Sequence, residues 1–399
     1  MMAFTPIIKF YYAGGAGIEF TSIVLSAEIS TGRSNFVDQY SGKSAKIVIK
    51  NSSNESSVFT INQTIGIFNG NNIFWRGRVS GISYEDNKVD SGLSTATLTV
   101  DDQFARLGRV KVANRTILSN LGSTQLLTFN STTYGGVGPL TDVLLYELGY
   151  PSTAGYQSSS TMSGSVFTGS VLDYMNKVQS TENANMIVTG DSVAMVSRTI
   201  ITNDIYKMRI EEPESSGLYV NLKLGRTSSD TTIMYDSFTR SNFLDFFAKN
   251  VSVEPAGLAA QIGQNAYSYT TFGEYSYSRS TIDQTTAQAL VLAKNLAQKL
   301  SDQIAVQFNI SFLLESQNET VAQIFLNSLI TAKVIDVVYR VPGSGTDTTT
   351  PCVIEGATYS LRPKQTRFTL NLTPLAVYTE YQNFTLDTGY GVLNQDTLG

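Results

Sequence analysis

Apolar and polar residues alternate through the first hundred positions of the chain. The period of two is clearest over residues 46–50 and 95–100, where it places the apolar side chains on one face of a sheet. Glycines separate such stretches. The pattern predicts six strands, at residues 7–12, 23–30, 45–50, 64–68, 73–83 and 94–100. Six short strands in this length favour a small antiparallel barrel or sandwich, followed by a short capped helix over 101–107.

The spacing of apolar residues changes to a helical period in the next segment. It predicts one helix over 141–148, which ends at Gly149, and a second over 170–178 with Ser170 as its N-cap. A hairpin of strands at 184–189 and 193–197 follows. Residues 112–215 are therefore expected to form an α+β insert.

A third segment, 216–304, mixes both patterns. Strands are predicted at 217–224, 250–254 and 264–269, and the longest helix over 281–300, where Thr281 and Gln284 have the spacing of a capping box. Strands then return at 306–314, 333–340, 352–361 and 367–372. Two prolines bound residues 342–351, which we expect to be an exposed hairpin tip. The fold class is mainly β, with antiparallel β-barrels at both ends and α+β domains between them.

The amino-acid composition limits the kinds of catalytic and metal sites that the chain can form. The chain has no histidine, which excludes Ser-His-Asp and Cys-His nucleophile pairs and histidine metal sites. Charged residues are 15% of the total, and Ser, Thr, Asn, Gln and Tyr replace them, as in β-rich proteins with polar contact surfaces. The one cysteine, Cys352, is expected to be a small buried hydrophobe. We predict no catalytic residue, no metal ligand and no cofactor.

Two groups of residues allow a functional and a structural interpretation. The acidic pairs Asp101–Asp102 and Glu211–Glu212 could serve a glycosidase, but adjacent side chains point apart, so we expect solvated faces. Trp75 and the tyrosine-rich stretch 267–277, with Tyr275, could stack on sugars. The alternative, that these aromatics are core and cross-strand pairs, is favoured.

The net charge of −5 argues against stable binding of nucleic acid. The first ten residues lack the basic and apolar regions of a signal peptide, and no uncharged apolar run reaches about 18 residues. We therefore expect neither classical secretion nor a membrane span.

Several stretches, taken in order, resemble the minor tail proteins of tailed bacteriophages that form the tail-tip or baseplate hub. The opening matches at Val24 to Arg33, with Phe36 to Tyr40 and a strand that ends in Asn51. Further matches follow the same order as in that family: Ile73 to Val79, Ala96 to Asp102, Asp142 to Gly149, Gly169 to Tyr174, Phe247 to Glu254, Val353 to Ser360 and Arg367 to Pro374. No single motif is diagnostic; the resemblance rests on their collinear order over most of the chain.

The resemblance implies five parts: a β-barrel hub domain at 1–111, an α+β insert at 112–215, an α+β domain at 216–304, a second β-barrel hub domain at 305–385 and a tail at 386–399. It implies a structural virion protein rather than an enzyme, located at the phage tail tip after synthesis in the host cytoplasm. Three chains would present six barrels and so adapt a six-fold tube to a three-fold tip.

Expected partners are the tail tube or distal tail protein and a central spike, fibre or tape-measure protein, with DNA only in transit through an acidic lumen. A receptor- or carbohydrate-binding adhesin remains the alternative, and a tail-associated glycosidase or peptidase is the least favoured.

Overall fold

A computed structural model describes most of the chain. The described residues are 8–12, 17–70, 72–86, 93–117, 121–122, 161–189, 192–196, 201, 207–211, 219–241, 248–265, 275–300, 306–328, 333–341, 343–363 and 365–378. The predicted helix over 141–148 lies outside them.

The N-terminal β module follows the alternating pattern closely. Its strands are β1 (Ile8–Tyr12), β2 (Ile18–Glu19), β3 (Val24–Gly32), β4 (Ser44–Lys50), β5 (Thr64–Asn69), β6 (Asn72–Glu85) and β7 (Thr95–Asp101), with short 3-10 turns at Thr21–Ile23 and Glu55–Val58. They pair antiparallel in the order β3-β4-β7-β6-β5-β1-β2. Helix α1 (Gln103–Arg109) follows at once, as expected.

The C-terminal β module gathers strands from two parts of the sequence. Its elements are β16 (Lys223–Gly225), β17 (Thr232–Met234), β18 (Ser237–Ser241), β22 (Gln307–Leu313), α8 (Glu319–Ser328), β23 (Val334–Arg340), β24 (Asp347–Arg362) and β25 (Gln365–Pro374), with 3-10 turns at Leu314–Ser316 and Leu375–Val377. The sheet runs β18-β22-β25-β24-β23-β16-β17. Helix α8 was not predicted, and the expected loop at 342–351 is shorter because β24 already begins at Asp347.

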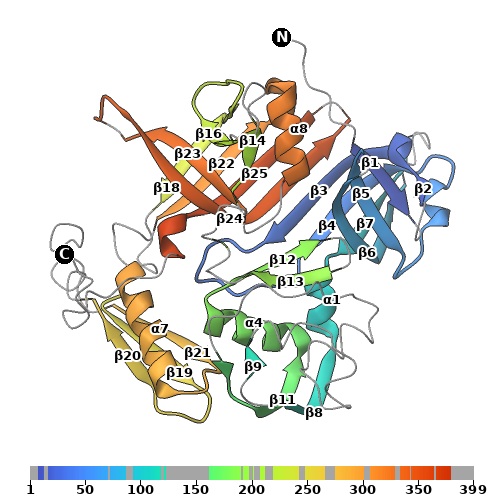
Figure 1. The fold of residues 1–399 in the computed structure, drawn as a ribbon. Helices are drawn as coiled ribbons and strands as arrows, with labels where there is room; N and C mark the ends of the chain where they lie inside the picture. The colour runs from blue at the N-terminus through green and yellow to red at the C-terminus, as the bar shows by residue number, and fades with distance from the viewer. Residues whose placement is uncertain are drawn as a thin grey trace.

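Strand β24 joins the two modules into one sheet of 14 strands. Along one edge it pairs first with β23, from Arg340↔Asp347 to Val334↔Val353, and then with β3, from Gly32↔Gly356 to Ala27↔Leu361. Its other edge pairs with β25. Strand β3, from the first tenth of the sequence, and strand β24, from the last seventh, therefore lie side by side in one sheet (Figure 1). Among the described strands the pairing leaves open edges, so a closed barrel at either end stays a prediction.

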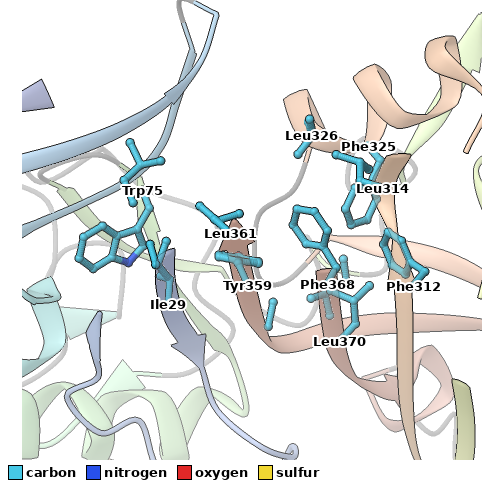
Figure 2. Close-up of a cluster of buried hydrophobic side chains, with 14 of the residues drawn as sticks. Ile29, Trp75, Phe312, Leu314, Phe325, Leu326, Tyr359, Leu361, Phe368 and Leu370 are labelled. Atoms are coloured by element: carbon cyan, nitrogen blue, oxygen red, sulfur yellow. The ribbon is translucent and has the colours of Figure 1, made fainter. Parts of the chain in front are cut away.

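One hydrophobic core includes side chains from both modules of this shared sheet. Figure 2 shows Trp75 and Ile29 of the N-terminal module next to Leu361 and Tyr359 of β24, and then Phe368, Phe312 and Phe325 of the C-terminal module. All belong to one cluster of buried side chains. Burial of this size is the main favourable term in folding, so the two modules stabilise each other.

The α+β material lies below the large sheet in Figure 1. The insert contains β8 (Lys111–Ile117), β9 (Leu121–Gly122), β10 (Thr161–Met162), β11 (Ser165–Ser170), α4 (Val171–Glu182), β12 (Asn185–Thr189) and β13 (Ser192–Val196). Ser170 caps α4 and forms the expected capping box with Asp173, and β12–β13 is the expected hairpin. The next pair along the chain, β14 (Arg209–Glu211) with β15 (Tyr219–Asn221), lies instead against the C-terminal module, where Figure 1 labels β14.

The smallest unit packs a helix on a three-stranded sheet, β19 (Asn250–Pro255), β20 (Gln261–Gln264) and β21 (Ser276–Thr281). Helix α7 spans Thr286–Lys299, so its predicted start at residue 281 is wrong. Thr285 and Gln288 form the capping box, whereas Thr281 ends β21 and pairs with Pro255 of β19. Pairing with β19 therefore decides which of two similar Thr-x-x-Gln motifs begins the helix.

Candidate functional site

A buried ion pair lies where the two β modules meet. Arg33 follows the last residue of β3, and Glu355 lies at a bulge in β24, 322 residues away in sequence. Arg33 Nε donates to Glu355 Oε2 at 2.8 Å, and the backbone N–H of Arg33 donates to the Glu355 carbonyl at 2.9 Å. The two side chains are 1% and 0% exposed. The attraction within a buried ion pair offsets the cost of removing both charges from water only when further hydrogen bonds satisfy their remaining donors and acceptors.

Two more segments supply those bonds. Tyr378 comes from the end of the C-terminal module and Asn185 from the start of β12 in the insert. Arg33 Nη2 donates to Tyr378 Oη at 2.7 Å and to Asn185 Oδ1. The Tyr378 hydroxyl donates to Glu355 Oε1 and lies 2.9 Å from Asn185 Oδ1. One guanidinium thus joins the N-terminal module, the C-terminal module and the insert.

The environment holds Arg33 charged. Burial by itself lowers the pKa of its guanidinium, but Glu355, Tyr378 and Tyr40 outweigh that effect and keep the pKa well above its ordinary value. Burial raises the pKa of Tyr378, against the opposing effect of Arg33, and raises that of Tyr40 to about 12. Both phenols are therefore neutral at ordinary pH, and Tyr378 is the one that donates to Glu355.

The loop after Arg33 is fixed to the insert as well. The Tyr40 ring lies 5.0 Å from the Arg33 guanidinium carbon, a cation–π distance. The Asn176 side chain on α4 accepts from the Tyr40 backbone N–H at 3.0 Å and donates to the Tyr40 carbonyl at 2.9 Å. We define Arg33, Glu355, Tyr378, Asn185 and Tyr40 as the junction cluster. Its chemistry is that of an orientation lock, because all five side chains are buried and Arg33 contacts each of the other four.

Gly356 lets β3 and β24 approach at this point. A Cβ on Gly356 would lie 2.4 Å from the Arg33 carbonyl oxygen and 2.7 Å from that of Thr31. Gly356→Ala is expected to lower the free energy of unfolding by more than about 2 kcal/mol, because backbone atoms must shift. Gly81, also at a strand bulge, is the matched control: its added Cβ meets Thr99 at 3.7 Å, so Gly81→Ala should change stability by less than about 1 kcal/mol. Urea unfolding of both variants measures the two changes in the free energy of unfolding. Equal changes would contradict the close approach of β3 and β24 at Gly356 as the cause.

The acidic pair Asp101–Asp102 is buried, so the expected solvated face is wrong. Asp102 caps α1: its Oδ1 accepts from the backbone N–H of Ala105 at 2.7 Å and of Lys43 at 3.1 Å. Burial raises the pKa of Asp102 to about 7, although those donors oppose the shift. Asp101 accepts from Ser80 and forms an ion pair with Arg109. Both carboxylates therefore stabilise the connection between β7 and α1 at the end of the N-terminal module.

The structure also locates the other residues that the sequence analysis considered for function. Trp75 is 7% exposed and belongs to the shared core, which confirms the core interpretation. Its buried ring is not available to stack on a sugar. Tyr275 is 40% exposed, while residues 266–274 lie outside the described part. Cys352 is buried, as expected. Glu211 is in β14; Glu212 is not among the described residues.

Within the described ranges, no three His, Cys, Asp or Glu residues gather as ligands for a metal ion. No helix there is long and apolar enough to cross a bilayer. The junction cluster itself was missed by sequence reasoning. Arg33 and Glu355 lie in two of the motifs quoted for the resemblance, but no pattern in the neighbouring sequence of either residue indicates that they form an ion pair.

Comparison with known proteins finds similarity in structure alone, since no family model and no curated protein matches the sequence. The 43 kDa tail protein of prophage MuSo2 from Shewanella oneidensis matches with a TM-score of 0.57 and 9% identity, over 94% of this chain and 99% of that one. A tail protein from Neisseria meningitidis gives 0.57 and 10%, over 92% and 96%. A prophage tail protein of Listeria monocytogenes gives 0.51 and 10%, over 92% and 94%. This chain has the fold of phage tail proteins, as its motif order indicated.

Proposed function

We propose that this chain is a structural protein of a phage tail, and that within the tail it forms the hub of the tip or baseplate. The supporting likeness in fold extends over nearly the full length of both chains, and the similar structures are described as tail proteins. The proposed role needs no catalytic residue.

The observation that carries the hub assignment is that two β modules of one chain share a single sheet and core. Strand pairing of β3 with β24, the shared core and the junction cluster leave the modules little freedom to rotate against each other. A protein with two fixed β modules per chain presents six when it forms a three-fold ring. Such a ring matches a six-fold tube on one side and a three-fold tip on the other.

In this proposal a homotrimer caps the tail tube, contacts the tube or distal tail protein above and a spike, fibre or tape-measure protein below, and opens for DNA. The two β modules are the hub domains: the first lies within residues 1–111, and the second joins β22–β25 of the expected domain 305–385 to β16–β18 of the segment 216–304. The insert of β8 to β13 with α4, and the unit of β19–β21 with α7, lie outside the ring. DNA passes without being held, consistent with the net charge of −5.

Light scattering on the purified full chain tests the assembly. We expect a species of three times the 43.5 kDa monomer mass, with a fraction that rises with concentration. Electron microscopy of that species should show a ring of six similar lobes. A monomer at every concentration, or a closed dimer, would contradict the trimeric hub and favour an accessory or receptor-binding tip protein.

A further inference from the structure

A cavity of about 360 Å³ lies in the C-terminal module, beside the tip of the β23–β24 hairpin. Its lining comes from the end of β16, the β17–β18 connection, β18 and the hairpin tip: Arg226, Tyr235, Phe238, Tyr339, Arg340, Val341, Gly343 and Ser344. The volume is at the lower end of the range for small-molecule sites. The junction cluster contributes no residue to it.

Aromatic rings form one wall. Phe238 stacks between Tyr235 and Tyr339, with ring centroids 5.4 and 5.3 Å apart and planes within 27° and 20° of parallel. Behind them, Phe308 of the core packs on Phe238 and Tyr339. The Tyr235 hydroxyl donates to the Val338 carbonyl at 3.2 Å. The wall is therefore held in place before any ligand arrives, which reduces the entropy cost of binding.

Two arginines at the rim of the cavity form ion pairs with the same carboxylate, that of Asp347. Arg340 Nε donates to Asp347 Oδ1 at 2.8 Å, and Arg226 Nη1 lies 3.8 Å from the same oxygen. Their side chains are 45% and 50% exposed. Among the charged residues described here, the group carries an excess of one positive charge in a chain of net charge −5. Because Arg340 uses only its Nε on Asp347, its terminal N–H groups can still bind an anion in bidentate form.

The hairpin tip lines one side of the cavity, which is open to solvent. The Ser344 backbone N–H donates to the Val341 carbonyl at 2.9 Å, and the Ser344 hydroxyl accepts from the Thr346 N–H at 3.3 Å. Gly343 has a φ of +83°, and no atom lies within 4 Å of where its Cβ would be. The turn at Gly343 therefore has open space where a side chain would lie, and Gly343 lines the same cavity as the two arginines.

We propose that this cavity is a binding site for an acidic saccharide, a sugar ring that carries a carboxylate or a phosphate. The ring's apolar C–H face packs on the aromatic wall, the anion binds Arg340 and Arg226, and hydroxyls bond at the hairpin tip. The small volume favours a sugar unit over a folded partner. A neutral sugar leaves the excess positive charge unpaired and binds less tightly.

Ligand-observed NMR titration of the full chain tests the site, with trigalacturonate, glucose 6-phosphate, neutral maltotriose and hexaglutamate as probes. We expect trigalacturonate or glucose 6-phosphate to bind at least about ten-fold tighter than maltotriose, the difference made by a charge-assisted hydrogen bond. Which of the two acids binds tighter identifies the carboxylate or the phosphate as the source. Salt at 0.5 M should weaken the acidic probes selectively.

Arg340→Gln and Arg226→Gln should each weaken binding of the acidic sugar about ten-fold, while leaving the fold unchanged because both side chains are exposed. Arg362→Gln is the matched control, since Arg362 is an exposed arginine at the other end of β24 and should bind as the parent does. Equal affinity for maltotriose, equal losses in all three variants, or no binding of either acid would overturn the proposal. Tighter binding of hexaglutamate would assign the cavity to an acidic peptide and overturn it as well.

Discussion

Replacing Arg33 with leucine is expected to lower the free energy of unfolding by about 3–5 kcal/mol. The substitution leaves the Glu355 carboxylate buried with Tyr378 as its remaining donor in the junction cluster. A carboxylate removed from water without a cation is among the most costly groups in a protein interior. Urea denaturation, followed by far-UV circular dichroism, measures the change.

The double variant Arg33→Leu/Glu355→Leu separates the cost of an unpaired charge from the value of the pair. Apolar replacement of both members of a buried pair is often nearly neutral, so we expect it to recover more than half of the lost stability. Arg367→Leu is the surface control. Arg367 pairs with Asp236 at 2.8 Å, but both side chains are more than a third exposed, so its loss should be a small fraction of the Arg33 effect. A change below about 1 kcal/mol for Arg33→Leu would contradict the orientation lock.

The strands were predictable because their signal is local. A period of two in half-buried strands located β1 and β3 to β7 within about two residues of their observed ends. Helix α8 also has a local signal that the sequence analysis passed over. Val321, Ala322, Phe325 and Leu326 have helical spacing and are all buried, and Asn318 Oδ1 accepts from the Thr320 N–H at the start.

What the sequence could not predict depends on contacts between distant residues. The start of α7 followed from pairing of Thr281 with another strand, not from its own capping motif. Asp101 and Asp102 were expected in water because adjacent side chains point apart, but the fold buries both. Asp102 is the acceptor at the N-terminus of α1, and Asp101 pairs with Ser80 and Arg109. The meeting of Arg33 and Glu355 requires the β3–β24 register, which no local pattern contains.

Phe368→Ala is expected to lower the free energy of unfolding by about 3–5 kcal/mol, through lost burial and the cavity left behind. Phe368 is fully buried; its ring stacks on Phe312 at 5.5 Å and contacts Phe325 and Tyr359 at 5.3 and 5.2 Å between centroids. Phe368→Leu keeps most of the volume and should cost much less.

The same variant tests whether the two β modules unfold together. Trp75 is the chain's one tryptophan and lies in the N-terminal module, so its fluorescence reports on that module, whereas Phe368 lies in the C-terminal one. Because both side chains belong to one core cluster, Phe368→Ala should shift the Trp75 transition by as much as the circular dichroism transition. A Trp75 transition that stays at the parent urea concentration would mean that the modules unfold separately. A rigid pair of modules, on which the hub proposal depends, would then be excluded.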